Sequence, residues 1–165
     1  MLAVNQIFCL LVWLSFGLSG VSAHAALPSG LLGVEDVVPN ISALDQRGKQ
    51  FNSTNGVRYL LIATEMACAK AANLKLAAQG ADFLETNRAA YLLDIHTMPA
   101  VARWFALPKM RTYPERIVLV DNAGTLAAVP VQAGRVTVLA LTPEDRVRQI
   151  SYWDPVSELV DGYLH

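Results

Sequence analysis

The sequence predicts an α/β domain in which helices flank a central mixed β-sheet. Two apolar runs, 59–63 and 89–95, the second interrupted only by Asp94, are typical of strands buried on both faces, as central parallel strands are. The Ala-, Leu- and Lys-rich stretch between them is long enough to form the crossover helix that parallel strands require. After residue 115, apolar and alternating segments separated by turns indicate an antiparallel meander.

Local signals set the expected boundaries in the first half of the domain. Gly48 supplies a positive φ for a hairpin turn, Thr64 is a candidate helix N-cap, and Gly80 suits the position just after a helix. The expected elements are a hairpin over 41–52, a strand over 58–64, a helix over 65–79, a further helical turn over 81–87 and a strand over 89–95.

The second half begins with another helix, expected over 99–107 with Thr97 as its N-cap and Pro108 interrupting it. Three large apolar residues lie on one stripe of this helix, and we expect them to pack into the core: Val101, Trp104 and Phe105. The remaining expected elements are strands over 115–121, 125–131, 135–142 and 146–153, and a terminal helix that Asp154 caps, with Pro155 at its first position.

The N-terminus has the pattern of a secretory signal peptide. Residues 7–18 are continuously apolar, which is too short for a membrane span, and small residues follow, with cleavage expected after Ala23 or Ala25. Because residues 2–6 contain no Lys or Arg, an uncleaved anchor is the alternative. We therefore expect a signal peptide over 1–23, a single domain over 26–165, and a periplasmic protein without membrane contact after cleavage.

Charge and cysteine content restrict the function further. The formal net charge is −1, and neither a nucleic-acid footprint nor an acidic tail is visible. The one local basic cluster, residues 109–116, could bind a partner, and the expected partner is another exported or membrane protein. Of the two cysteines, Cys9 leaves with the signal peptide. The exported chain then carries only Cys68, so it cannot form an internal disulfide.

The junction between the first buried strand and its helix resembles the active site of the thioredoxin family. Cys68 takes the place of the first cysteine of the C-x-x-C motif, and Ala71 stands where the second cysteine would be. Tyr113-Pro114 precedes an apolar strand, as the cis-proline that faces the thiol pair does in that family. The resemblance implies a thioredoxin-like fold with an N-terminal hairpin extension, and a Tyr113–Pro114 bond in the cis form opposite Cys68.

Most of the chain after the leader resembles a narrower group, small exported thioredoxin-like proteins of Gram-negative bacteria that lack the C-x-x-C pair. Some members of this group carry the name FAD/FMN-containing dehydrogenase. No G-x-G-x-x-G motif follows a strand here, so we expect no flavin or other cofactor. His24, His96 and His165 are scattered without metal-ligand spacing, and we expect no metal site.

Two alternative functions are compatible with Cys68 and its surroundings. A helix N-terminus and Lys70 would lower the pKa of the thiol, whereas Glu65 would raise it, and no second thiol exists to resolve a mixed disulfide. The first hypothesis is a binding or accessory protein without dithiol redox activity; the alternative is a monothiol oxidoreductase or peroxide-reactive enzyme that uses Cys68. The candidate residues of a peptide-binding groove are Glu65, Lys70, Tyr113 and Pro114.

Overall fold

The computed structural model describes residues 30–54 and 56–165. The predicted signal peptide with both cleavage positions, Cys9 and His24 lie outside the described residues. Within the described ranges, no helix combines the length and apolar character needed to cross a membrane.

All strands of the described chain belong to one seven-stranded sheet with the order β2-β1-β5-β4-β3-β6-β7. The strands β3, β4 and β5 are mutually parallel, and the pairs β1–β2, β1–β5, β3–β6 and β6–β7 are antiparallel. The strands are β1 (Ser42–Asp45), β2 (Gln50–Asn52), β3 (Tyr59–Ala63), β4 (Ala89–Asp94), β5 (Ile117–Val120), β6 (Val136–Leu141) and β7 (Val147–Trp153). The helices are α1 (Met66–Gln79), α2 (Phe83–Thr86), α3 (Ala100–Met110) and the 3-10 turn η1 (Val160–Tyr163).

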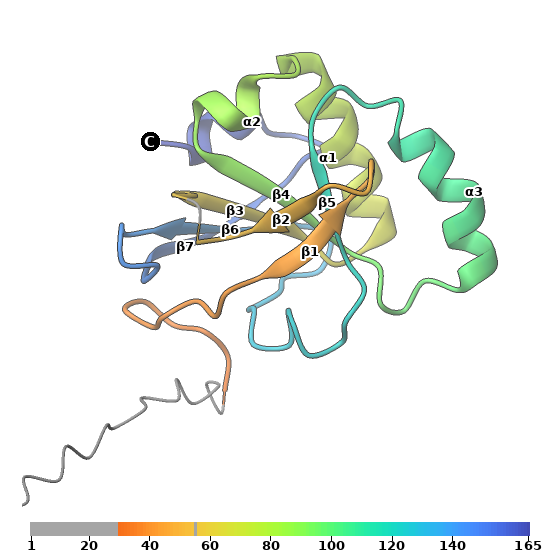
Figure 1. Cartoon of the computed structure of the whole chain (residues 1–165). Coiled ribbons are helices and arrows are strands. Elements are labelled where there is room, and N and C mark those ends of the chain that lie inside the picture. The colour runs from red at the N-terminus through yellow and green to blue at the C-terminus, as the bar shows by residue number, and fades with distance from the viewer. Residues whose placement is uncertain (1–29, 55) are drawn as a thin grey trace, which may run out of the picture.

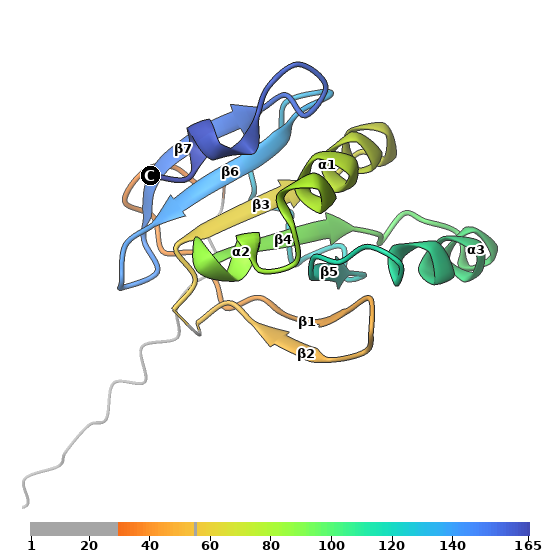
Figure 2. The same cartoon turned by 90° about the horizontal axis from the view of Figure 1, so that it is seen from above.

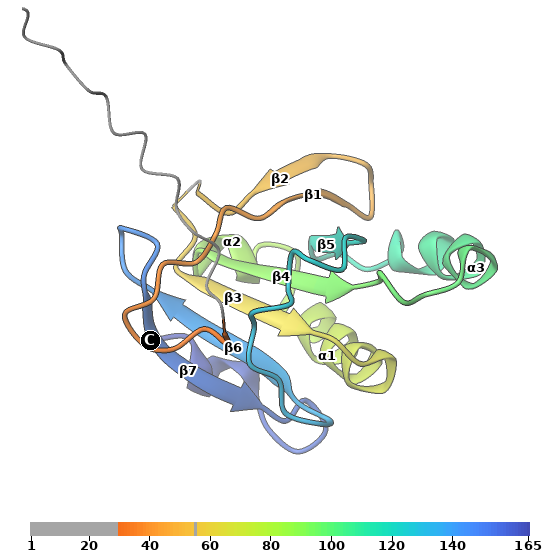
Figure 3. The ribbon, with the colours of Figure 1, turned by 90° about the horizontal axis from the view of Figure 1, so that it is seen from below.

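The two faces of the sheet are covered differently. Residues of α1, α2, α3 and η1 share one buried cluster with the side chains that Tyr59, Leu61 and Ala63 project from β3. Leu60 and Ile62 point to the other face, where they pack against the irregular segments 30–41 and 121–131. Figures 1 and 2 show the helices gathered on one side, and the view from below in Figure 3 shows coil crossing the other side.

The first helix agrees with the expectation apart from its start. Glu65, with extended φ and ψ, is the N-cap residue in place of Thr64, and no side chain caps the helix. Cys68 is therefore the third helical residue and not the fourth. Gly80 ends the helix at a φ of 100°, as the sequence predicted.

The helix α3 departs from the expectation in three respects. Its N-cap is Pro99 and not Thr97, and Pro108 lies inside the helix, which continues to Met110. Loss of one backbone hydrogen bond is tolerated this close to the C-terminal end. The expected core stripe is exposed, because the residues that pack on the body are Ala106, Leu107 and Met110.

Two expected elements near the C-terminus are absent from the described residues. Segment 125–131 forms turns instead of a strand, and it covers the coil-bearing face through Leu126 and Val129. The terminal helix is replaced by a turn at Asp154, whose carboxylate accepts the Val156 N–H at 2.9 Å, followed by η1. Short polar side chains favour such local turns over helix propagation.

Candidate functional site

Cys68 lies where the carboxyl end of β3 meets the first turn of α1. Two strand ends share this edge of the sheet, because Thr137 of β6 pairs with Ile62 and Trp153 of β7 pairs with Val136. The side chain of Cys68 is only 4% exposed and belongs to the buried cluster under α1. It is the one free cysteine among the described residues.

The surroundings of Cys68 oppose the formation of a thiolate. Burial, followed by the negative charges of Glu65 and Asp154, raises the pKa of the thiol to about 11. These effects outweigh any help from the helix dipole or from Lys70, whose side chain is exposed. The geometry therefore fits a small buried side chain better than a nucleophile.

Glu65 takes part in this edge through a contact that the sequence did not predict. One of its carboxylate oxygens accepts the backbone N–H of Gly134 at 3.2 Å, which ties the start of α1 to the loop that precedes β6. Glu65 thus has two effects at this edge: it binds the loop before β6, and its negative charge raises the pKa of Cys68.

Pro114 precedes a strand that is not the neighbour of β3. The strand that follows it, β5, pairs in parallel with β4, so β4 separates it from β3. The antiparallel neighbour of β3 is β6, which Gly134 and Arg135 precede. The carbonyl oxygens of Tyr113 and Pro114 accept hydrogen bonds from the Arg47 guanidinium, at 2.8 Å and 3.4 Å, so this segment is fastened to the β1–β2 turn. The cis form of the bond stays a prediction.

A groove between α1 and α3 brings together two of the four predicted groove residues, Lys70 and Tyr113. Its volume is about 130 Å³, and neither Glu65 nor Pro114 lines it. The lining residues are Met66, Ala69, Lys70, Asn73, Leu93, Ala106, Lys109, Met110 and Tyr113. The walls are therefore mainly apolar, with the exposed Lys70 and Lys109 at the rim.

Asn73 is the polar residue of this groove that sequence reasoning missed. It is 5% exposed, and its Oδ1 atom has no hydrogen-bond partner within the described structure. A buried polar atom without a partner costs free energy, so a ligand donor that reaches it would relieve that cost. The sequence signal was an Asn on the otherwise apolar buried face of α1.

A larger hollow of about 640 Å³ lies toward the amino ends of β4 and β5, between β2 and α2. None of the residues predicted to form a site lines it. Its Arg116 is already engaged, with hydrogen bonds to the Asp45 carboxylate at 2.9 Å and to the Gln50 carbonyl at 2.8 Å.

Comparison with known proteins identifies the fold. The chain overlays on the crystal structure of the thioredoxin domain of a thiol-disulfide oxidoreductase from Bacteroides vulgatus with a TM-score of 0.52 and 15% identity, covering 81% of this chain and 99% of the other. For a thiol:disulfide interchange protein from a Bacteroides species, the TM-score is 0.51 and the identity 11%, with 81% and 91% covered. No family model matches the sequence, and no curated protein matches it. The chain has a thioredoxin-like fold.

Proposed function

We propose that this chain is a periplasmic thioredoxin-fold accessory or binding protein without dithiol redox activity, and that the α1–α3 groove contacts its partner. The observation that carries the proposal is the state of Cys68. Cys68 is 4% exposed, and burial together with Glu65 and Asp154 raises the pKa of its thiol to about 11, so the thiol form predominates at neutral pH. A resolving cysteine is missing from the sequence once Cys9 is removed with the signal peptide.

The groove suggests the chemistry of the partner. Its volume of about 130 Å³ accommodates one apolar side chain, and Lys70 and Lys109 attract an acidic neighbour in the same segment. A backbone or side-chain N–H of the partner would satisfy Asn73 Oδ1. We infer an exported or membrane protein that inserts an apolar residue flanked by Asp or Glu.

The alternative is a monothiol oxidoreductase or peroxide-reactive enzyme. It is supported by the position of Cys68 in the first turn of a helix at the carboxyl end of a central strand. It requires a thiolate that burial, Glu65 and Asp154 all disfavour.

Alkylation of the native protein as a function of pH separates the two functions. We expect the rate at Cys68 to rise only above about pH 10, whereas the same chain in denaturant reacts near the ordinary thiol pKa of about 8.5. Cys68→Ala serves as the blank. A native rate that reaches its plateau near neutral pH would establish a reactive thiol and overturn the binding proposal.

The groove is tested with a photo-crosslinking amino acid at position 70 in the exporting cell, and with the same amino acid at exposed position 144 as the control. We expect a crosslinked partner from position 70 alone. Asn73→Leu, which fills the same space without the carbonyl, should abolish that crosslink while the protein stays folded. An undiminished crosslink in this variant would exclude the groove as the contact.

A further inference from the structure

Within the described residues, the outer face of α3 is an apolar stripe on which no other segment packs. Val101, Trp104 and Phe105 are 69%, 73% and 68% exposed, and Trp104 and Phe105 pack edge to face with ring centroids 5.0 Å apart. The exposed Pro108 extends the spacing to i, i+3, i+4 and i+7, which places all four on one side of the helix. We call these four residues the α3 stripe.

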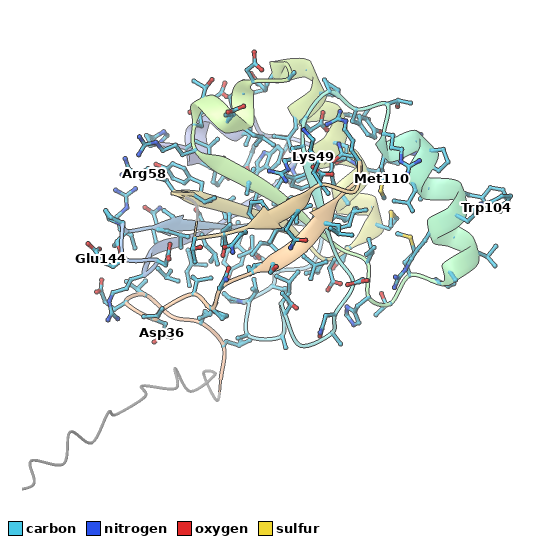
Figure 4. The ribbon with its side chains drawn as sticks, in the orientation of Figure 1. Asp36, Lys49, Arg58, Trp104, Met110 and Glu144 are labelled. Atoms are coloured by element: carbon cyan, nitrogen blue, oxygen red, sulfur yellow. The ribbon has the colours of Figure 1, made fainter. Side chains whose placement is uncertain are left out.

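The stripe points away from the protein because the opposite side of α3 is already used. Ala106, Leu107 and Met110 pack on the body, and the Arg103 side chain donates to the carbonyls of Ile95 and Met98 at 2.8 Å and 2.9 Å. Figure 1 shows α3 at the margin of the molecule, and Figure 4 shows Trp104 directed outward from it. Large apolar side chains gathered on such a helix mark a contact surface.

Positive charge accompanies the α3 stripe on both sides. At 100° per residue, Lys109 lies about 90° to one side of the stripe and Arg111 about 70° to the other. Arg111 is exposed, but its Nε atom donates to the Gln46 carbonyl at 3.0 Å. No acidic residue occurs in the sequence between Asp94 and Glu115, and Glu115 is fully buried. An aromatic face between cations is the pattern of a helix that lies in a membrane interface, where Trp is favoured and Lys or Arg reach the headgroups.

We propose that α3 docks this domain on the surface of an anionic lipid bilayer, with Trp104 and Phe105 in the interface and Lys109 at the headgroups. This contact goes beyond the proposed partner binding and does not depend on it. The sequence-based expectation of no membrane contact rested on the lack of a membrane-spanning segment. A peripheral contact with the bilayer surface needs no such segment.

The size and charge of the stripe favour a bilayer over a second copy of the chain. A stable protein interface buries about 800 Å² per partner, more than one face of an 11-residue helix offers. Two copies paired through this stripe would also bring their Lys109 and Arg111 side chains together without acidic partners, which is unfavourable.

Tryptophan fluorescence tests the proposal directly. The sequence has three tryptophans, Trp13, Trp104 and Trp153, and Trp153 is 0% exposed. In the full chain with Trp13→Phe, a blue shift on adding vesicles therefore reports Trp104. We expect the shift, and quenching by brominated lipid, with phosphatidylglycerol–phosphatidylcholine vesicles. With phosphatidylcholine alone the shift should be weaker, and added salt should reduce binding to the anionic vesicles.

Variants that keep Trp104 as the reporter show whether the stripe is responsible. Phe105→Ala should weaken partitioning about tenfold, Lys109→Gln about fivefold, and Val101→Glu should abolish it. The matched control is Val156→Ala with Leu159→Ala, which removes apolar groups that are 76% and 62% exposed near the C-terminus and should change nothing. Because the replaced side chains are exposed, far-UV circular dichroism should be unchanged.

Three results would overturn the proposal. The first is an unshifted Trp104 emission at all lipid concentrations. The second is equal binding by the wild-type and Val101→Glu chains, which would place the contact elsewhere, including the apolar run at 7–18. The third is a blue shift without lipid that follows protein concentration and doubles the sedimenting mass, which would make a second copy the occupant.

Discussion

The side-chain amide of Gln46 binds the backbone on both sides of Arg116. Its nitrogen donates to the Glu115 carbonyl at 2.7 Å, and its oxygen accepts the Ile117 N–H at 2.9 Å. The Gln46 backbone N–H also donates to the Ile117 carbonyl at 2.9 Å. A buried glutamine, 1% exposed, thus extends the β1–β5 pairing beyond the last strand residue.

Gln46→Ala should therefore lower the free energy of unfolding by about 3 kcal/mol, because it leaves a buried carbonyl and a buried N–H without partners. Urea denaturation measures the loss. Gln50→Ala is the control, since its exposed amide bonds mainly to Ser42 and should cost less than about 1 kcal/mol. Equal losses in the two variants would contradict the bridging role.

Glu115 is the least favourably placed ionisable group among the described residues. Its carboxylate oxygens are buried and have no hydrogen-bond partner in the part of the chain that the structure describes, and burial raises its pKa above the ordinary value of 4.5. In the folded protein the group therefore retains its proton at a pH where the unfolded chain has lost it. Its contribution to stability is complete below about pH 4.5 and declines as the pH rises through the folded-state pKa.

Glu115→Gln should consequently raise the melting temperature at pH 7 and reduce the loss of stability between pH 4.5 and 7. The free energy of unfolding at pH 7 should increase by about 1–3 kcal/mol, which is the cost of an uncompensated buried group. Calorimetry at several pH values measures it, with the exposed Glu144→Gln as control. A parallel pH dependence in wild type and variant would show that Glu115 finds a partner in solution.

The sequence predicted correctly those elements whose type and ends depend on local signals. It did not predict the features that depend on contacts between distant segments. The Ala-rich helix α1, its end at Gly80 and the strands β3 and β4 follow from propensity and apolar runs alone. In contrast, β5 and β6 are both short, fully buried strands, and nothing local determines which one lies beside β3. The expected position of Pro114 opposite Cys68 therefore stays a prediction, because the strand that follows Pro114 pairs with β4 and not with β3.

The same limit explains the α3 stripe. The sequence correctly placed Val101, Trp104 and Phe105 on one side of a helix, but α3 carries a second apolar side formed by Ala106, Leu107 and Met110. Periodicity does not say which of two apolar sides faces the core. The position of Cys68 followed from the strand–helix junction, whereas Asn73 and the groove depend on how α3 packs against α1.

Arg103 is predicted to hold the start of α3. Arg103→Ala removes hydrogen bonds to the carbonyls of Met98, Ile95 and His96. The donor in each is the charged guanidinium, and hydrogen bonds from a charged donor are stronger than neutral ones. We expect a loss of about 1.5–3 kcal/mol and faster amide exchange in α3 than in α1. Arg148→Ala is the control, because among the described residues that exposed side chain bonds only to the carbonyl of His165. Unchanged exchange in α3 would exclude this role.

Glu65→Gln should lower the pKa of Cys68, because the Glu65 charge is the second cause of its elevation after burial. The pKa should nevertheless stay above the ordinary thiol value of about 8.5, since desolvation is the larger effect and Asp154 keeps its charge. The pH profile of Cys68 alkylation measures the shift, with Glu144→Gln as a control that leaves the profile unchanged. Because the amide oxygen of the introduced glutamine would still accept the Gly134 N–H, the loop before β6 should stay in place. A profile unaffected by Glu65→Gln would show that burial alone sets the state of the thiol.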